Sequence, residues 1–238
     1  MSDLHILSLT SVIELKEVEF RWPNSSQPAL SIQDLCVKRG EHLFIKGPSG
    51  CGKSTLLSLL TGINQAQRGE VSILGTNLST LTSRQRDRFR ADHIGYIFQQ
   101  FNLLPYLSVI ENVTLPCHFS STRKQNVAGD LIEKAKQLLT RLHLAPELLT
   151  KPVIELSIGQ QQRVAAARAL IGEPKLIIAD EPTSALDHDN RLAFIELLLE
   201  ETNRAGSTLV FVSHDPTLEA LFDRAVYLPQ LNQAGVTA

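Results

Sequence analysis

A glycine-rich stretch with the sequence GPSGCGKST, residues 47–55, carries the clearest chemistry in this chain. It matches the pattern G-x-x-x-x-G-K-[ST], and it lies between an apolar run and a run of helix-forming residues, as the pattern requires. Such glycines let backbone N–H groups turn inward around phosphate oxygens, and the helix that follows adds the positive end of its dipole. We expect Lys53 to reach the β- and γ-phosphates of a nucleotide and the Ser54 hydroxyl to ligate Mg²⁺.

Polar side chains also follow three other apolar runs. Asp180 and Glu181 end the run in LIIADEP, where Asp180 suits a hold on Mg²⁺ and its waters. Glu181 points elsewhere and would polarise an attacking water as a general base. Gln99 ends IGYIFQ, where its amide can ligate Mg²⁺ and orient water, and His214 follows TLVFVS, where an imidazole would lie near the γ-phosphate.

The stretch LSIGQQQR, residues 156–163, has no metal ligand, nucleophile or acid–base group ahead of Arg163. Taken alone, it predicts the start of a helix. Ser157 would cap that helix, and good helix formers continue to a stop at Gly172.

The composition excludes several classes of protein. The chain has 238 residues, 43% of them hydrophobic, and a net charge of −2, which gives no support for nonspecific nucleic-acid binding. The basic stretch SRQRDRFR, residues 83–90, indicates a solvated helix face. The cysteines form no C-x-x-C pair, so we expect neither zinc nor disulfides. No signal peptide and no apolar run of roughly 18 residues is present, so any role at a membrane would come through a partner.

The elements that must position these groups follow an α/β pattern. The first part of the chain predicts β-strands, at 13–20, 29–37 and 42–47. Apolar strands and helices then alternate, which is typical of a mostly parallel sheet covered on both faces. The clearest members are strands at 175–180 and 208–213 and the helix between them at 188–206.

One segment, residues 101–172, interrupts the alternation. It holds a helix at 127–144 and no convincing strand. We therefore expect a single domain over 1–238, in which a helical lobe at about 101–172 is inserted into a core with a β subdomain, formed by about 1–100 and 173–238.

The motifs together resemble those of ATP-binding cassette (ABC) ATPases. The glycine-rich loop, Gln99, LSIGQQQR, LIIADEP, SALD (184–187) and VSH (212–214) occur in that family's order and spacing, from about Ile13 to Leu228. The resemblance implies an α/β fold with a RecA-like P-loop NTPase core, an antiparallel β subdomain and an inserted helical subdomain. It also implies ATP and Mg²⁺ as cofactors, and a homodimer that sandwiches ATP head to tail.

The same resemblance assigns roles to single residues. LSIGQQQR resembles the L-S-G-G-Q signature, which binds the γ-phosphate held by the partner's P-loop through its serine hydroxyl and a glycine N–H. Asp187 ends the D-loop, which crosses the dimer interface. An aromatic residue ahead of the P-loop stacks on adenine, and we choose Trp22 over Phe20 because it lies just before a turn. The catalytic set is Glu181, His214 and Gln99; the Mg²⁺ set is Ser54, Gln99 and Asp180; the nucleotide-binding set is Trp22, Gly47, Pro48, Ser49, Gly50, Cys51, Gly52, Lys53, Ser54, Thr55, Ser157, Gly159, Gln160 and Asp187.

Within the family, residues 95–116 resemble the subgroup that powers macrolide-type exporters and the lipoprotein-releasing machinery. Such subunits work with a permease whose coupling helix docks after Gln99, and we expect an anchoring patch of Phe101, Leu103, Leu104 and Tyr106. Ile158 departs from the signature, and residues 227–238 lack the family's D-G turn.

The resulting prediction is an ABC ATPase subunit at the cytoplasmic face of the inner membrane, held there by a permease and used for export or force transmission, with no nucleic-acid partner. The alternatives are an importer subunit, a cell-division cassette and a soluble ABC ATPase acting on nucleic acid or ribosomes.

Overall fold

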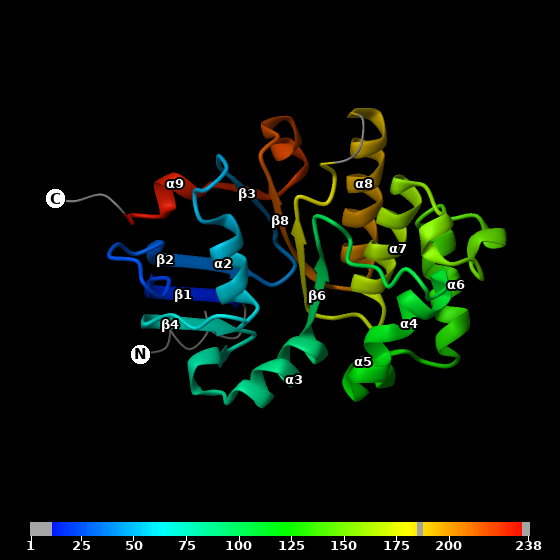
Figure 1. The fold of residues 1–238 in the computed structure, drawn as a ribbon, viewed down its shortest axis with the longest axis horizontal. Helices are drawn as coiled ribbons and strands as arrows, with labels where there is room; N and C mark the ends of the chain where they lie inside the picture. Colours follow the sequence, from blue (N-terminus) through cyan, green and yellow to red (C-terminus); the bar gives the residue numbers. More distant parts are fainter. Residues whose placement is uncertain (1–10, 185–187, 235–238) are drawn as a thin grey trace. The chain divides into compact units, whose positions relative to one another are not determined.

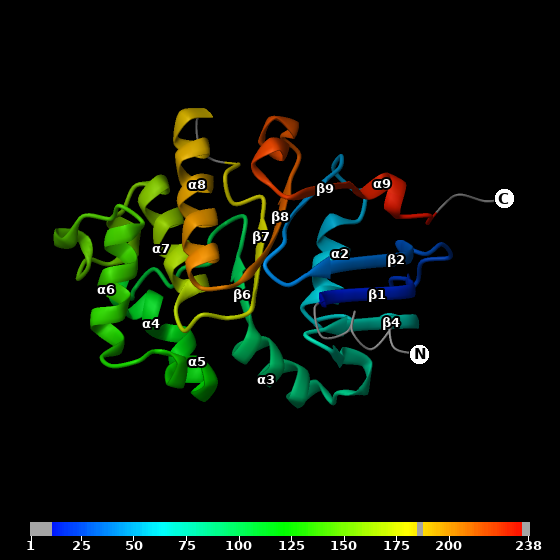
Figure 2. The same ribbon diagram turned by 180° about the vertical axis from the view of Figure 1, so that it is seen from behind.

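The computed structural model describes residues 11–184 and 188–234 (Figures 1 and 2). These residues form two compact units, one from residues up to 90 together with those from 210 onward, and one from residues 91–209. Helix α3 (Ser83–His93) and strand β8 (Thr208–Ser213) carry the chain from one unit into the other. The two units are described separately below.

An antiparallel sheet with strand order β2-β1-β4-β5 forms one layer of the first unit. Its strands form because apolar residues alternate along them: Leu15 of β1 lies opposite Leu35 on one side and Val71 on the other, and Leu15 is fully buried. The register of β1 against β4 shifts between Lys16 and Glu19. The strands are β1 (Ser11–Phe20), β2 (Leu30–Lys38), β4 (Arg68–Ile73) and β5 (Thr76–Asn77).

The first unit also holds a parallel strand pair, in which Ile45 of β3 lies opposite Val226 of β9. Helix α2 starts shortly after β3 and lies beside the antiparallel strands in both views (Figures 1 and 2). Arg86 and Arg90 of α3 donate hydrogen bonds to the carbonyls of Gly62 and Thr61 just after α2, so the predicted solvated basic face is partly structural. The elements are β3 (His42–Lys46), α2 (Lys53–Leu60), η1 (Leu78–Thr80), η4 (Pro216–Leu221), β9 (Arg224–Tyr227) and α9 (Leu228–Leu231).

The second unit is built around helix α7, which packs against β6, α4, α6 and α8. Strands β6 and β7 pair in parallel, with Ile97 opposite Ala179. Gly95 lets β6 approach α7, because a methyl group there would lie 2.3 Å from the Ala169 carbonyl oxygen. The elements are β6 (Ile94–Ile97), α4 (Val109–Phe119), α5 (Ser121–Asn126), α6 (Leu131–Arg141), η2 (Pro146–Leu148), η3 (Val153–Glu155), α7 (Ile158–Leu170), β7 (Leu176–Asp180) and α8 (His188–Arg204).

The predicted α/β class and the strand at 208–213 are confirmed. The helix predicted at 127–144 is shorter, because Gly129 has a left-handed φ of 95° and the Asp130 side chain caps the N–H groups of Ile132 and Glu133. Among described residues 101–172 the structure has no strand, only an isolated bridge between Ser108 and Pro152. The compact second unit extends beyond that segment, since it also contains β6, β7 and α8.

Candidate functional site

The glycine-rich loop forms a cradle of backbone N–H groups in the first unit. Gly50 and Gly52 have φ values of 80° and 104°, a left-handed conformation that favours glycine at both positions. Helix α2 starts at Lys53 with no side-chain cap and no acidic residue in its first turn, so no negative side chain of that turn competes with an anion for its first N–H groups. The buried Lys53 ammonium donates to the carbonyls of Gly47, at 2.8 Å, and Pro48, at 3.1 Å. This arrangement suits a phosphate chain.

His214 belongs to the same unit and lies near the start of this loop. Lys46, Gly47, Pro48, His214, Pro216, Tyr227 and Gln230 line one cavity of about 490 Å³. The His214 side chain is exposed, and Lys46 forms an ion pair with Glu219. The structure therefore places His214 beside the start of the loop that would hold the phosphates.

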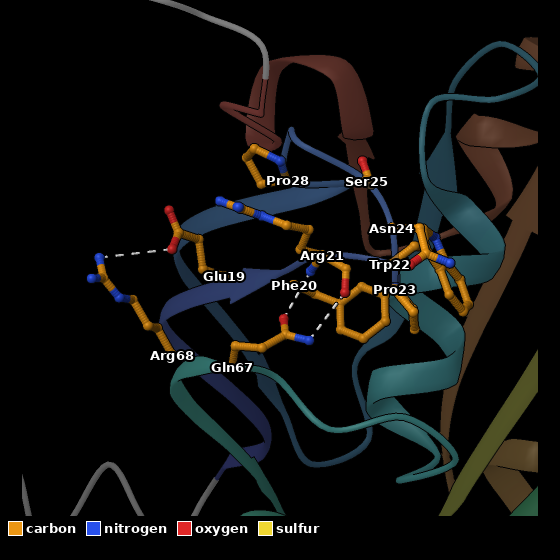
Figure 3. Close-up of a pocket in the computed structure, with 10 residues that line it drawn as sticks. All are labelled: Glu19, Phe20, Arg21, Trp22, Pro23, Asn24, Ser25, Pro28, Gln67 and Arg68. Carbon is orange, nitrogen blue, oxygen red and sulfur yellow. Dashed lines mark hydrogen bonds and ion pairs between the residues drawn. The ribbon is translucent and has the colours of Figure 1, made fainter.

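Trp22 lines another cavity of the first unit, of about 670 Å³, which Figure 3 shows in close-up. Trp22 is 45% exposed, and its indole meets the ring of the buried Phe20 edge-on, with 4.9 Å between ring centroids. The Gln67 amide accepts from the Arg21 N–H at 2.8 Å and donates to the Arg21 carbonyl at 3.0 Å, which fixes the end of β1 (Figure 3). Of the two aromatic candidates, Trp22 is the one with an exposed ring.

In the second unit, Asp180 and Glu181 lie at the end of β7. The Tyr96 hydroxyl, from the neighbouring strand β6, donates to the Asp180 carboxylate at 3.4 Å. Burial, together with the nearby charge of Asp180, raises the pKa of Tyr96, so this hydroxyl keeps its proton. Glu181 has a left-handed φ of 45°, which is costly for a residue with a Cβ and is typical of functional positions. The end of β7 thus carries two successive carboxylates, the second of them on a left-handed backbone.

Gln99 begins a loop that hydrogen bonds from helix α7 hold in place. Phe101 and Asn102 have φ values of 59° and 48°, both left-handed. Arg168 of α7 donates to both of their carbonyls, at 2.5 Å and 2.6 Å. We did not predict this clamp, although an arginine among buried alanines in RVAAARAL is a sequence signal for a special partner.

The predicted signature starts helix α7. The Ser157 hydroxyl accepts from the Gln160 N–H, and the Gln160 side chain accepts from the Ser157 N–H, which makes a reciprocal capping box. Ser157, Gly159 and Gln160 line a cavity of about 380 Å³ with His143, Gln162, Arg163, Asn190 and Phe194. Gln162 is fully buried, and neither polar atom of its amide has a hydrogen-bond partner in the part of the chain that the structure describes. Ile158 is 53% exposed, so an isoleucine at this position of the signature does not disturb the packing of the core.

Each unit therefore gathers its own share of the predicted residues. The first brings together residues 47–55, His214 and, on a separate cavity, Trp22. The second joins Tyr96 to Asp180 and places the signature at an open cavity. Asp187 lies outside the described residues.

Comparison with known proteins decides the family. Residues 30–184 match the family model described as ABC transporter. The chain belongs to the ABC transporter family. The lipoprotein-releasing system ATP-binding protein LolD of Shewanella sp. (strain MR-4) is 42% identical over 191 residues, which is 80% of each chain. The macrolide export ATP-binding/permease protein MacB of Pasteurella multocida (strain Pm70) is 38% identical over 95% of this chain, which spans only 35% of MacB.

A solved structure agrees with the fold of this ABC protein. It is the dimeric, post-hydrolysis state of the ATP-binding cassette MJ0796 bound to ADP and Pi, with a TM-score of 0.80, 36% identity and coverage of 90% of this chain and 93% of that one. The predicted ABC ATPase fold and the resemblance to macrolide-exporter and lipoprotein-releasing proteins are confirmed. The chain is an ATP-binding ATPase subunit of this family. None of its described helices has the length and apolar character needed to cross a membrane.

Proposed function

We propose that this ABC ATPase closes as a homodimer around two ATP molecules and drives a separate membrane permease, for export or for force transmission. The observation that carries the proposal is the start of α7, where Ser157 and Gly159 line an open cavity with no acidic residue in the helix's first turn. Such a helix end attracts a phosphate. That the solved MJ0796 cassette is a dimer supports a second copy as the source of that phosphate.

The P-loop, residues 47–55, fits a nucleoside triphosphate. Its N–H groups and the start of α2 would bind phosphate oxygens, and Lys53 would exchange its two carbonyl partners for phosphate oxygens. Trp22 would offer its exposed ring to adenine, a role that the edge-on contact with Phe20 leaves open. Residues 47–55 together with Trp22 would therefore bind the nucleotide.

The donor set also fits Mg²⁺, which prefers oxygen ligands and retains several waters. The Ser54 hydroxyl, the Gln99 amide and the Asp180 carboxylate are all oxygen donors. No three His, Cys, Asp or Glu side chains gather into a metal cluster within the described residues. Phosphate oxygens and water would then complete the coordination shell, and the bound ion would neutralise charge on the phosphates.

Glu181 would position the attacking water and take its proton. Glu181 follows Asp180 directly and has a left-handed backbone, so one strand end would supply a metal ligand and a base from two successive residues. His214, next to the P-loop, would hydrogen-bond the γ-phosphate, and the signature would stabilise the charge that develops on it.

The permease would dock on the helical segment after Gln99. Tyr106 is 75% exposed, and Leu103 and Leu104 are partly exposed, which suits an anchoring patch. Phe101 does not belong to this patch as predicted, because it is 7% exposed and its ring is packed inside the unit. Ile154 is 70% exposed beside the Ser108–Pro152 bridge and takes its place. Docking there would hold the chain peripherally at the cytoplasmic face of a membrane.

The Glu181→Gln variant tests the catalytic assignment. We expect ATP binding to persist while turnover falls at least about a hundredfold and an ATP-bound dimer accumulates, measured by phosphate release and by size-exclusion chromatography with light scattering. Glu173→Gln is the matched control, because Glu173 also has a left-handed φ, of 51°, but pairs with Lys134 instead of following a strand end. Undiminished hydrolysis in Glu181→Gln would refute the assignment.

A second experiment separates the alternative functions. An affinity-tagged Glu181→Gln chain is captured from detergent-solubilised membranes and from a soluble fraction prepared without nuclease. Recovery of a permease with few spans and a large outer domain supports export or force transmission. Recovery of an importer permease, ribosomes or nucleic acid would overturn it.

A further inference from the structure

The segment that follows β9 packs behind the phosphate loop. Leu228 in α9 is fully buried, and a methyl group added to Gly47 would lie 3.1 Å from Pro229 Cδ. At the other end of the loop, a methyl group on Gly52 would lie 3.6 Å from Asn232 Nδ2. Figures 1 and 2 both place α9 next to the start of β2 and the start of α2. One short segment thus supports both ends of residues 47–52, at the place where the sequence departs from the family's D-G turn.

The Asn232 side chain ties this segment to strand β2. Its Oδ1 accepts from the Ser31 N–H at 2.8 Å, and its Nδ2 donates to the Ala29 carbonyl at 3.1 Å. The Gln233 N–H donates to the Ser31 carbonyl at 2.8 Å. These bonds resemble the pairing that a neighbouring strand would make with the start of β2. Because Asn232 is partly buried, its amide is also partly shielded from competing water.

Ala29, which Asn232 binds, also connects this segment to Trp22 through Phe20. The Ala29 N–H donates to the Phe20 carbonyl at 2.8 Å, and the Phe20 ring meets the Trp22 indole edge-on. Asn232 therefore lies beside Gly52 of the phosphate loop on one side and, through Ala29 and Phe20, supports the turn that carries the indole on the other.

We propose that Asn232 is a positioning residue for the nucleotide, which sets the distance between the phosphate loop and the Trp22 turn. The inference rests on the proposed function, in which ATP binds to both. Asn232 itself touches neither the phosphates nor the base. Its effect is on affinity: a chain without these bonds still hydrolyses ATP but binds it less tightly.

The variants separate the two hydrogen bonds. Asn232→Ala removes both side-chain bonds, and Asn232→Asp keeps the acceptor for Ser31 but loses the donor to Ala29. Gln233→Ala is the matched control, because it alters an exposed neighbouring side chain and keeps the backbone bond. Each lost bond is worth roughly a factor of two to ten, so we expect KM for ATP to rise about tenfold in Asn232→Ala and about threefold in Asn232→Asp.

The test is steady-state ATPase kinetics of the full chain, together with competition by tripolyphosphate, which lacks a base and does not span to Trp22. The inference predicts a raised KM with kcat within about twofold, and a Ki for tripolyphosphate that rises less than about threefold. A merely structural defect would reduce the active fraction, so that kcat falls and KM stays unchanged; that result, or unaltered kinetics, overturns the inference. If Asn232→Ala does not fold, the KM of Asn232→Asp decides. A wild-type chain without ATPase activity would instead refute the proposed function.

Discussion

Substitution of Arg168 by lysine tests whether the signature helix controls the Gln99 loop. Arg168 donates to the carbonyls of Phe101 and Asn102, two consecutive residues with left-handed backbones. The left-handed conformation costs Phe101 about 1–2 kcal/mol, whereas each hydrogen bond from a charged donor contributes about 1.5–3 kcal/mol. Burial lowers the pKa of Arg168, yet the group stays charged at neutral pH. The free energy of the two hydrogen bonds from Arg168 thus exceeds the cost of the left-handed loop.

Lysine has one ammonium in place of the planar fork and keeps only one of these two bonds. The one remaining bond, worth about 1.5–3 kcal/mol, then does little more than balance a strain of about 1–2 kcal/mol, and the loop leaves its position for part of the time. Because Gln99 is proposed to act on the metal and the water, we expect kcat to fall about tenfold to thirtyfold while KM for ATP changes less than about twofold.

The assay is phosphate release at saturating ATP, with thermal unfolding measured in parallel. Arg141→Lys is the control, because Arg141 pairs with the buried Glu201 at 2.8 Å in the same unit and has no contact with the loop in the described residues. A comparable loss of stability in both variants with a fall in kcat only in Arg168→Lys is the expected outcome. A fully active, folded Arg168→Lys enzyme would refute the reasoning.

Three further predictions concern the cavities and the P-loop. Trp22→Ala should raise the Kd for ATP about tenfold, measured by equilibrium binding, while Trp22→Phe retains most of the affinity; equal loss in both would argue against stacking. Cys51, whose sulfur lies 2.6 Å from where a Gly47 methyl group would be, should react with maleimide in the nucleotide-free chain and be protected by ATP; mass spectrometry that shows equal labelling would dismiss this. Gln162→Leu should raise the free energy of unfolding by about 1–2 kcal/mol in denaturant titrations, because it removes a fully buried amide without partners. A lower stability would show that the amide is satisfied in solution.

Local patterns were enough to predict the P-loop, the strand ends and the start of the signature helix. Glycines with positive φ, a serine cap and apolar alternation act within a few residues, so Gly50, Gly52 and Ser157 could be placed from the sequence. The choice of Trp22 also rested on local alternation, and its exposed ring is consistent with that choice.

Contacts between distant segments could not be predicted in this way. Arg168 and Phe101 are 67 residues apart, and Asn232 and Ala29 are 203 apart, so no periodicity links them. The burial of Phe101 depends on its left-handed φ, which turns the ring inward from a loop that looks like an exposed apolar run. The late start of the helix predicted at 127–144 could have been found, because Gly129 breaks the helix and Asp130 is the N-cap of the part that begins at Leu131.

The left-handed backbone of Glu181 also bears on how this chain would respond to selection. Glycine adopts a φ of 45° without the steric cost that a side chain with a Cβ incurs, which is of order 1 kcal/mol. A library randomised at position 181 and selected for heat resistance alone should therefore accumulate glycine. Because Glu181 is proposed to be the general base, the same library selected for ATP hydrolysis should retain glutamate. The difference between the two populations would measure how much folding stability this position gives up for the proposed chemistry.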